Sequence, residues 1–160
     1  MKLEITPLTK EAFAAFGDVI ETDGAQNFEI NNGSTVRYHD LANIETDAKV
    51  LVNIFRAAPL DYPVSVKMVE RHPKGSQAFF PLDNRPYLVL VAPKGETVAA
   101  KDLRAFTAGG RQGVNYHAGT WHHPVLALEA VSDFLVIDRG GEGENCDEIY
   151  FDAEDIRLAL

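Results

Sequence analysis

Residues 64–81 read Val-Ser-Val-Lys-Met-Val-Glu-Arg-His-Pro-Lys-Gly-Ser-Gln-Ala-Phe-Phe-Pro. A short run rich in valine is followed by the turn residues His-Pro-Lys-Gly and then by a second apolar run, which is the pattern of two strands joined by a turn. Further short runs of this kind recur along the chain, most of them bounded by turn residues, at 50–55, 64–69, 77–80, 87–92, 103–107, 125–131 and 134–137. Seven or more short strands predict an all-β barrel or sandwich.

Helix signals appear only near the two ends of the chain. Thr9 is a suitable N-cap for a short helix over residues 9–16, which Gly17 would end. Asp152 is a suitable N-cap for a second helix over residues 152–160, with two acidic residues in its first turn. The sequence therefore predicts an all-β fold with short helices at the N- and C-termini.

Composition narrows the class of protein. The chain has 160 residues, 46% of them apolar, which suits one core and predicts a single domain over residues 1–160. A formal charge of −9 with no local run of Lys or Arg argues against nucleic acid and anionic membranes as partners. Cys146 is the only cysteine, the first residues show no apolar signal core, and no apolar run is long enough to span a membrane. We expect a cytoplasmic protein.

Alternation along residues 64–72 sorts the side chains into two faces. One face would carry, in order, Val64, Val66, Met68, Glu70 and His72. The other would carry Ser65, Lys67, Val69 and Arg71. Because the first face begins apolar, we expect it to point into the barrel and to carry a carboxylate and an imidazole to the barrel mouth. Such groups are poorly placed there unless they bind a metal, a substrate or one another.

A second segment, residues 113–124, reads Gly-Val-Asn-Tyr-His-Ala-Gly-Thr-Trp-His-His-Pro and holds three of the five histidines. Histidine exchanges protons near neutral pH, and its neutral ring is a common metal ligand. The density of histidines predicts acid–base chemistry or a metal site here.

These two segments resemble the paired motifs of the cupin family, a double-stranded β-helix. Glu70-Arg-His72, followed by Gln77 and an apolar strand, is similar to the first motif, His-x-His then Glu. His117-Ala-Gly-Thr-Trp-His122 is similar to the second, Pro-x-Gly-x-x-His, with His117 in place of the proline. The resemblance implies a cupin-type β-barrel and a metal-ligand set of Glu70, His72, Gln77 and His122.

The whole chain further resembles the ureidoglycolate lyase family of allantoin degradation. The resemblance is carried by Glu-Ala-Phe-Ala-Ala-Phe-Gly-Asp near the N-terminus, Ile-Asn-Asn-Gly, Arg-Tyr-His-Asp-Leu-Ala, Glu-Arg-His-Pro, Gln-Gly-Val-Asn-Tyr-His, Trp-His-His-Pro and Asp-Phe-Leu-Val-Ile-Asp-Arg-Gly-Gly. It implies a cupin-type barrel, a homodimer, and cleavage of (S)-ureidoglycolate to glyoxylate and urea. An amidohydrolase that releases ammonia and a non-catalytic cupin that senses a small carboxylate are the alternatives.

This reaction needs a base for the substrate hydroxyl and a proton for the departing nitrogen. We predict His72, His122 and Glu70 at the hydroxyl end, as metal ligands or as direct acid–base groups, and His117 as the acid for urea. A divalent transition metal (nickel, manganese or zinc) fits the ligand types, and metal-free catalysis stays open. Asn115 and Tyr116, within the histidine-rich segment, are predicted to bind substrate.

The substrate carboxylate calls for an arginine, because a guanidinium binds a carboxylate in bidentate fashion. Arg104 is the first choice because it lies in the strand ahead of the histidine-rich segment, while Arg56 and Arg139 are the other candidates. The Asn-Asn pair at 31–32 and Tyr-His at 38–39 are candidates for a lid, a dimer contact or a simple turn.

Overall fold

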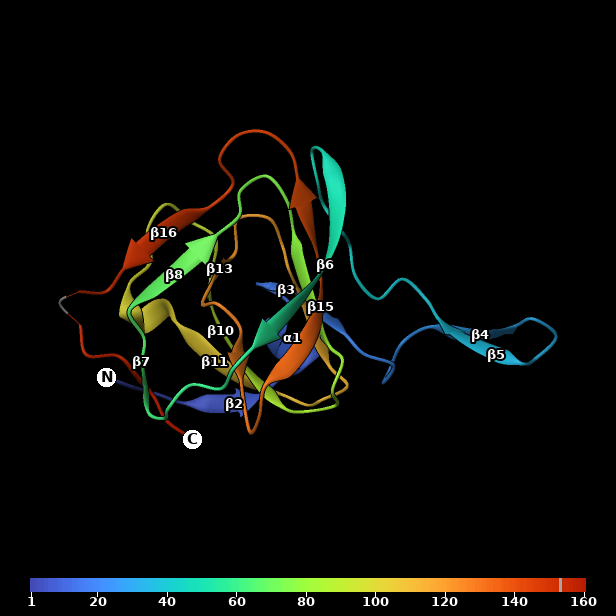
Figure 1. The fold of residues 1–160 in the computed structure, drawn as a ribbon, viewed down its shortest axis with the longest axis horizontal. Helices are drawn as coiled ribbons and strands as arrows, with labels where there is room; N and C mark the ends of the chain where they lie inside the picture. Colours follow the sequence, from blue (N-terminus) through green and yellow to red (C-terminus); the bar gives the residue numbers. More distant parts are fainter. Residues whose placement is uncertain (153) are drawn as a thin grey trace.

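The computed structural model describes residues 1–152 and 154–160, and two facing sheets form its body (Figure 1). The first sheet has the order β16-β8-β13-β10-β11-β2, and β14 also pairs with β10. Its strands are β2 (Ile5–Pro7), β8 (Met68–Arg71), β10 (Tyr87–Ala92), β11 (Arg104–Ala108), β13 (Trp121–His122), β14 (Leu126–Ala127) and β16 (Asp147–Tyr150). We call it the seven-stranded sheet.

The facing sheet has five strands in the order β3-β12-β9-β15-β6. They are β3 (Gly17–Ile20), β6 (Lys49–Ala57), β9 (Gln77–Pro81), β12 (Gly113–Tyr116) and β15 (Ser132–Gly140). The prediction of an all-β fold is confirmed, and two packed sheets of mainly antiparallel strands are the arrangement expected of a cupin-type barrel.

The remaining strands of the described residues form two smaller sheets. β1 (Lys2–Leu3), β17 (Arg157–Leu158) and β7 (Val64–Ser65) form a three-stranded sheet, and β4 (Asn27–Ile30) pairs with β5 (Thr35–Tyr38) in a hairpin. Figure 1 shows this hairpin projecting far from the rest of the molecule. The helical elements are α1 (Lys10–Phe13) and the 3-10 turn η1 (Ala100–Asp102). No helix in the described residues is both long and apolar enough to cross a membrane.

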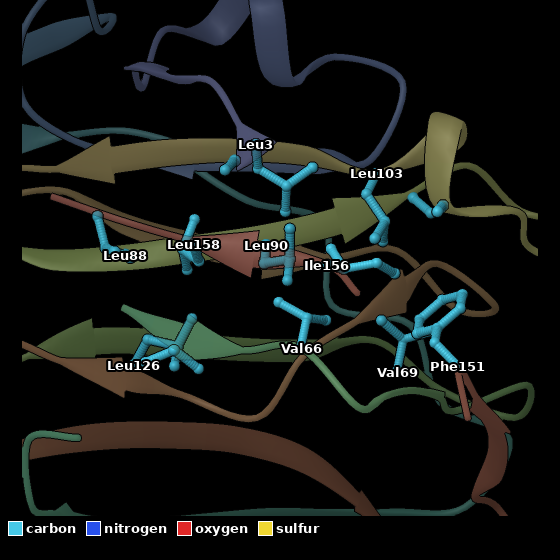
Figure 2. Packing of buried hydrophobic residues seen from close by; sticks show 14 of the residues in the cluster. Leu3, Val66, Val69, Leu88, Leu90, Leu103, Leu126, Phe151, Ile156 and Leu158 are labelled. Atoms are coloured by element: carbon cyan, nitrogen blue, oxygen red, sulfur yellow. The ribbon is translucent and has the colours of Figure 1, made fainter. Parts of the chain in front are cut away.

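β10 shows how the core is divided. Its six residues are all buried, because each face of the seven-stranded sheet is covered. Tyr87, Val89 and Val91 pack between the two large sheets, whereas Leu88 and Leu90 face the three-stranded sheet. Figure 2 shows this second layer, with Leu88 and Leu90 close to Leu158 and Ile156 of the C-terminal segment.

The structure corrects both predicted helices. Thr9 does cap α1, since its side chain accepts a hydrogen bond from Ala12 N at 3.1 Å, but the helix ends at Phe13 and turn residues follow. The helix predicted over residues 152–160 is wrong for the described residues, and Ala153 lies outside them. Ile156 and Leu158 are both fully buried, two positions apart, in the pattern of a strand, and β17 pairs with β1 and β7.

Two predicted strands also need correction. The run at 125–131 forms a strand only over Leu126–Ala127. The run at 64–69 is broken into β7 and β8, so its side chains do not alternate continuously. Val64, Val66 and Val69 all join the cluster that faces the three-stranded sheet, as Figure 2 shows for Val66 and Val69. The predicted single inward face from Val64 to His72 is therefore wrong for the valines, although Glu70 lies on the opposite side from Val69.

Candidate active site

Glu70 and His122 meet at one end of the space between the large sheets. Glu70 lies on β8 and His122 on the neighbouring antiparallel strand β13, and the two residues are directly opposite in the register. Directly opposed residues project to the same face of a sheet, so their side chains are forced together. Glu70 Oε1 lies 3.6 Å from His122 Nε2.

His72 completes the cluster just beyond the end of β8. Its Nε2 lies 3.8 Å from Glu70 Oε1, and the two imidazole rings are 5.1 Å apart between centroids. One ligand atom from each of the three residues lies within 4.8 Å of the others. The structure thus brings together Glu70, His72 and His122, as the sequence predicted.

Hydrogen bonds fix the orientation of both imidazoles. His72 Nδ1 lies 2.7 Å from the carbonyl oxygen of Asn145, and His122 Nδ1 lies 3.0 Å from that of Thr120. A carbonyl only accepts, so in each ring Nδ1 carries a proton, and in the neutral form of the ring Nε2 is the atom with the free lone pair. Both Nε2 atoms are buried and have no hydrogen-bond partner among the described residues. Histidines that bind metals typically donate from their other ring nitrogen to a carbonyl in this way, which fixes the orientation of the ring.

Electrostatics favour an ionised Glu70 carboxylate beside a neutral His122 imidazole. Burial lowers the pKa of His122, whose side chain is 2% exposed. The neighbouring His122 ring holds the pKa of the Glu70 carboxyl below its usual value, against the opposing effect of burial. At neutral pH the cluster therefore presents the Glu70 carboxylate beside the neutral His122 ring, which suits a proton or a cation.

Gln77 reaches the same region from the facing sheet. A cavity of about 290 Å³ is lined by His72, Ser76, Gln77, Asp138, Arg139, Asn145 and Cys146. Gln77 Nε2 donates to Asp138 Oδ2 at 3.2 Å, which leaves Gln77 Oε1 buried without a partner in the described chain. Gln77, the predicted neutral fourth ligand, thus shares a cavity with His72.

Tyr116 and Asn115 are adjacent in β12 and lie on opposite faces of it. Tyr116 stacks on His122, with ring centroids 4.3 Å apart and planes 6° from parallel, and burial raises the pKa of its hydroxyl. Asn115 instead donates from Nδ2 to Asp18 Oδ2 at 3.0 Å and to Asn43 O at 2.9 Å. Of the predicted substrate-binding pair, only Tyr116 lies against the cluster.

His117 is not brought to the cluster. Its Nε2 lies 3.3 Å from Asp18 Oδ2, and both residues line a separate cavity of about 260 Å³ that also includes Lys10. The geometry of one chain does not support the predicted role of His117 as the acid that protonates urea.

Comparison with known proteins shows which family the sequence matches. The ureidoglycolate lyase family model matches residues 1–158. A ureidoglycolate lyase of Pseudomonas putida (strain W619) is 59% identical over 159 residues, covering 98% of this chain and 95% of the relative. One of Pseudomonas savastanoi pv. phaseolicola (strain 1448A / Race 6) is 60% identical over 162 residues, covering 99% and 95%.

The chain belongs to the ureidoglycolate lyase family. In this structure each of the three candidate arginines already has hydrogen-bond or ion-pair partners. Arg104 donates to the carbonyls of Lys101 and Leu103, at 2.9 and 2.8 Å, away from the cluster. Arg56 is paired with Asp133 at 2.9 Å on the surface.

Arg139 is the candidate arginine that borders the 290 Å³ cavity. Its guanidinium is ion-paired with Asp47 and donates to the carbonyl of Glu142 at 3.0 Å. Arg139 is also the only permanently cationic residue among those described along the cavity. The predicted first choice, Arg104, is thus not at the site, and the arginine that is there already has a carboxylate partner.

Several residues of the site escaped the sequence reasoning. Asn145 orients His72 through its backbone carbonyl, from 73 residues away, and Asp138 holds Gln77. Cys146 places Sγ 3.9 Å from Glu70 Oε2, and burial raises the pKa of its thiol. Asn145 and Cys146 lie on the connection from β15 to β16, which has no motif that would mark it as part of a site.

Proposed function

We propose that this protein is a ureidoglycolate lyase that cleaves (S)-ureidoglycolate to glyoxylate and urea. The observation that carries the proposal is the convergence of Glu70, His72 and His122, with two unpartnered imidazole nitrogens, in a chain of the ureidoglycolate lyase family.

The reaction requires the protein to move one proton from the substrate hydroxyl to the departing nitrogen. The reacting carbon of ureidoglycolate carries both a hydroxyl and a ureido nitrogen. When the hydroxyl loses its proton, the oxygen forms a carbonyl and the carbon–nitrogen bond breaks. The departing nitrogen then takes a proton to give urea. The proton that leaves the oxygen is equivalent to the one that the nitrogen gains, so no net proton is needed.

The cluster supplies acceptors for that proton. The Glu70 carboxylate and the Nε2 lone pairs of His72 and His122 all point to one place. A group held in hydrogen-bond reach contributes on the order of 10²–10⁴-fold to such a transfer. A single acceptor that passes the proton on to the nitrogen is enough, so the remote position of His117 does not argue against the reaction.

With an ion bound, the same three groups act as ligands in place of direct proton acceptors: we propose that Glu70, His72 and His122 hold a divalent transition ion, with Gln77 as a neutral neighbour. The orphaned Nε2 atoms and the carbonyl-bound Nδ1 atoms support this ligand set. Nickel, manganese and zinc all suit imidazole and carboxylate ligands. A bound ion would lower the pKa of the substrate hydroxyl and orient the hydroxy acid.

A product assay tests the function. Protein stripped with a chelator and resupplied with single metals is incubated with ureidoglycolate, and urea, ammonia and glyoxylate are measured. Urea with an equal amount of glyoxylate supports the lyase. Free ammonia indicates the amidohydrolase instead, and binding without turnover indicates a sensor. Full activity after exhaustive chelation would contradict the metal proposal while leaving the lyase intact.

The proposal also covers the oligomeric state of the protein and its location in the cell. The family resemblance supports a homodimer in the cytoplasm that acts in allantoin degradation on a small carboxylate substrate. Equilibrium sedimentation measures the first property, and fractionation of cells measures the second.

A further inference from the structure

The β4–β5 hairpin, which we call the arm, has no support from its own body. Each of its strands pairs only with the other, in a two-stranded sheet that projects from the molecule (Figure 1). Three of its large apolar side chains are exposed, Phe28 by 41%, Val36 by 46% and Tyr38 by 42%. An isolated two-stranded hairpin is marginally stable in water, so the arm needs a surface to pack against.

β6 offers a surface of matching character. It is the edge strand of the five-stranded sheet, and its outward residues Val50, Val52 and Ile54 are 43%, 66% and 62% exposed. We call these three residues the strip. A long apolar edge strand is a template for pairing with another chain. The strip spans about 16 Å and each arm strand about 13 Å, so their lengths are similar.

The arm is held away from the body of its own chain. The segment between β5 and β6 is bonded to the barrel at successive points. Asn43 N donates to Asp18 at 3.0 Å, Glu45 N donates to Ser76 Oγ at 2.8 Å, and Asp47 pairs with Arg139. A second copy of the chain offers both an arm and a strip, and a two-fold arrangement covers all four surfaces at once.

The candidate site lacks an arginine that is free of a carboxylate partner, and the arm carries one, Arg37. Glu70 and Asp138 make the site region acidic, and Arg139 is committed to Asp47. Arg37 lies on the arm over the Phe28 ring, 5.8 Å from its centroid, with no carboxylate partner in the described residues. The strand that carries the strip lies beside two residues of the cavity wall, because Val50 is opposite Arg139 and Asn53, on the other face of β6, donates to Asp138 at 3.0 Å.

We propose that two copies exchange arms, that the arm of each lies on the strip of the other, and that Arg37 of the partner subunit binds the substrate carboxylate. The site is then completed by two chains. The identity of the substrate rests on the proposed function, whereas the exchange of arms does not.

Sedimentation tests the exchange independently of activity. Wild-type protein is compared with a strip variant, Val52→Lys with Ile54→Lys, and an arm variant, Phe28→Ser with Val36→Ser. Leu82→Lys is the matched control, because Leu82 is 49% exposed and lies outside both surfaces. We expect wild type and control at twice the chain mass, and both test variants at the chain mass with unchanged circular dichroism. A monomeric wild type, or a folded test variant that stays dimeric, overturns the proposal.

Mixing two impaired variants tests the position of Arg37. Arg37→Gln is expected to lower kcat/KM on the order of 10- to 100-fold, since it removes a charge-assisted hydrogen bond. His122→Ala disables the cluster of its own chain by removing one of its three groups. After unfolding and refolding together in equal amounts, random pairing restores about a quarter of wild-type activity if the arm acts in the partner's site. No recovery, or an Arg37→Gln variant with full activity, overturns this role. If wild type releases no urea, the proposed function fails while the sedimentation result still decides the exchange.

Discussion

His117 and His122 are five residues apart in the same segment, yet the fold gives them different surroundings. His122 is turned between the large sheets, 2% exposed, beside Glu70. His117 has a side chain 27% exposed and pairs with Asp18 on another part of the surface. Between them Gly119 adopts a φ of +82°, a conformation that favours glycine, as the chain passes from the five-stranded to the seven-stranded sheet. Density of histidines in a sequence thus does not imply that they converge.

The two environments suit different tasks. His122 is buried with a free lone pair, in a setting that lowers its pKa and keeps it neutral. His117 instead joins a network in which Asp18 also accepts from Asn43 N and Asn115 Nδ2. That network fastens the segment that leads from the arm to β6. We therefore expect His122 to matter for turnover and the Asp18–His117 pair to matter for stability.

The largest expected effect is that of His122→Ala. It removes one of the three convergent groups, so urea production should fall by about 10³-fold or more. Steady-state assays of urea and glyoxylate measure the loss, and circular dichroism confirms that the variant folds. A folded variant with near wild-type activity would remove the site assignment.

The next effect contrasts two neighbours on opposite faces of β8. Glu70→Gln removes the charge from the cluster and should lower kcat on the order of 10²-fold. Arg71 points away, stacks over Trp121 at 4.8 Å and pairs with Asp147 at 2.8 Å. Arg71→Gln should therefore spare kcat and cost about 1–2 kcal/mol of unfolding free energy in urea titrations. Equal and small effects on activity would show that Glu70 takes no part in turnover.

A comparison of β10 with the C-terminal strand β17 shows how much of the fold the sequence could predict. The apolar run of β10 was predicted with its bounds, because six consecutive buried residues leave a strong signal. The C-terminal strand could not be predicted in this way. Residues 152–160 have a good N-cap and acidic first turn, and only the distant β1 and β7 make a strand more favourable there.

The residues of the candidate site also fall into those that the sequence predicts and those that it does not. Glu70, His72 and His122 were predictable because the motifs mark them and neighbouring strands hold them. Asn115 and His117 were not, since the face of β12 and the crossing between sheets depend on tertiary pairing. The carbonyl of Asn145, which orients His72 from 73 residues away, leaves no mark in local sequence because any residue supplies a carbonyl.

A smaller effect is expected on the His117 side of the comparison. His117→Gln should keep kcat/KM within about threefold of wild type, less than 1 kcal/mol of transition-state free energy. Asp18→Asn should lower the free energy of unfolding by about 1–3 kcal/mol, because the carboxylate accepts from two donors of the network. Urea titration and steady-state kinetics measure the two quantities. A loss of kcat in His117→Gln as large as in His122→Ala would show that both histidines act in one site.

The smallest effect is expected at Arg104, the arginine that the sequence favoured for the substrate carboxylate. Its guanidinium donates to the carbonyls of Lys101 and Leu103, and Arg104 lines a cavity with Lys2 and Glu4, apart from the cluster of Glu70, His72 and His122. Arg104→Gln should leave KM and kcat unchanged within error, whereas loss of a carboxylate-binding arginine raises KM through lost uniform binding. Measuring KM for Arg104→Gln beside Arg37→Gln separates the two. If KM rises in Arg104→Gln and not in Arg37→Gln, the substrate carboxylate binds beside Arg104 at the start of β11. The arm would then have no role in substrate binding.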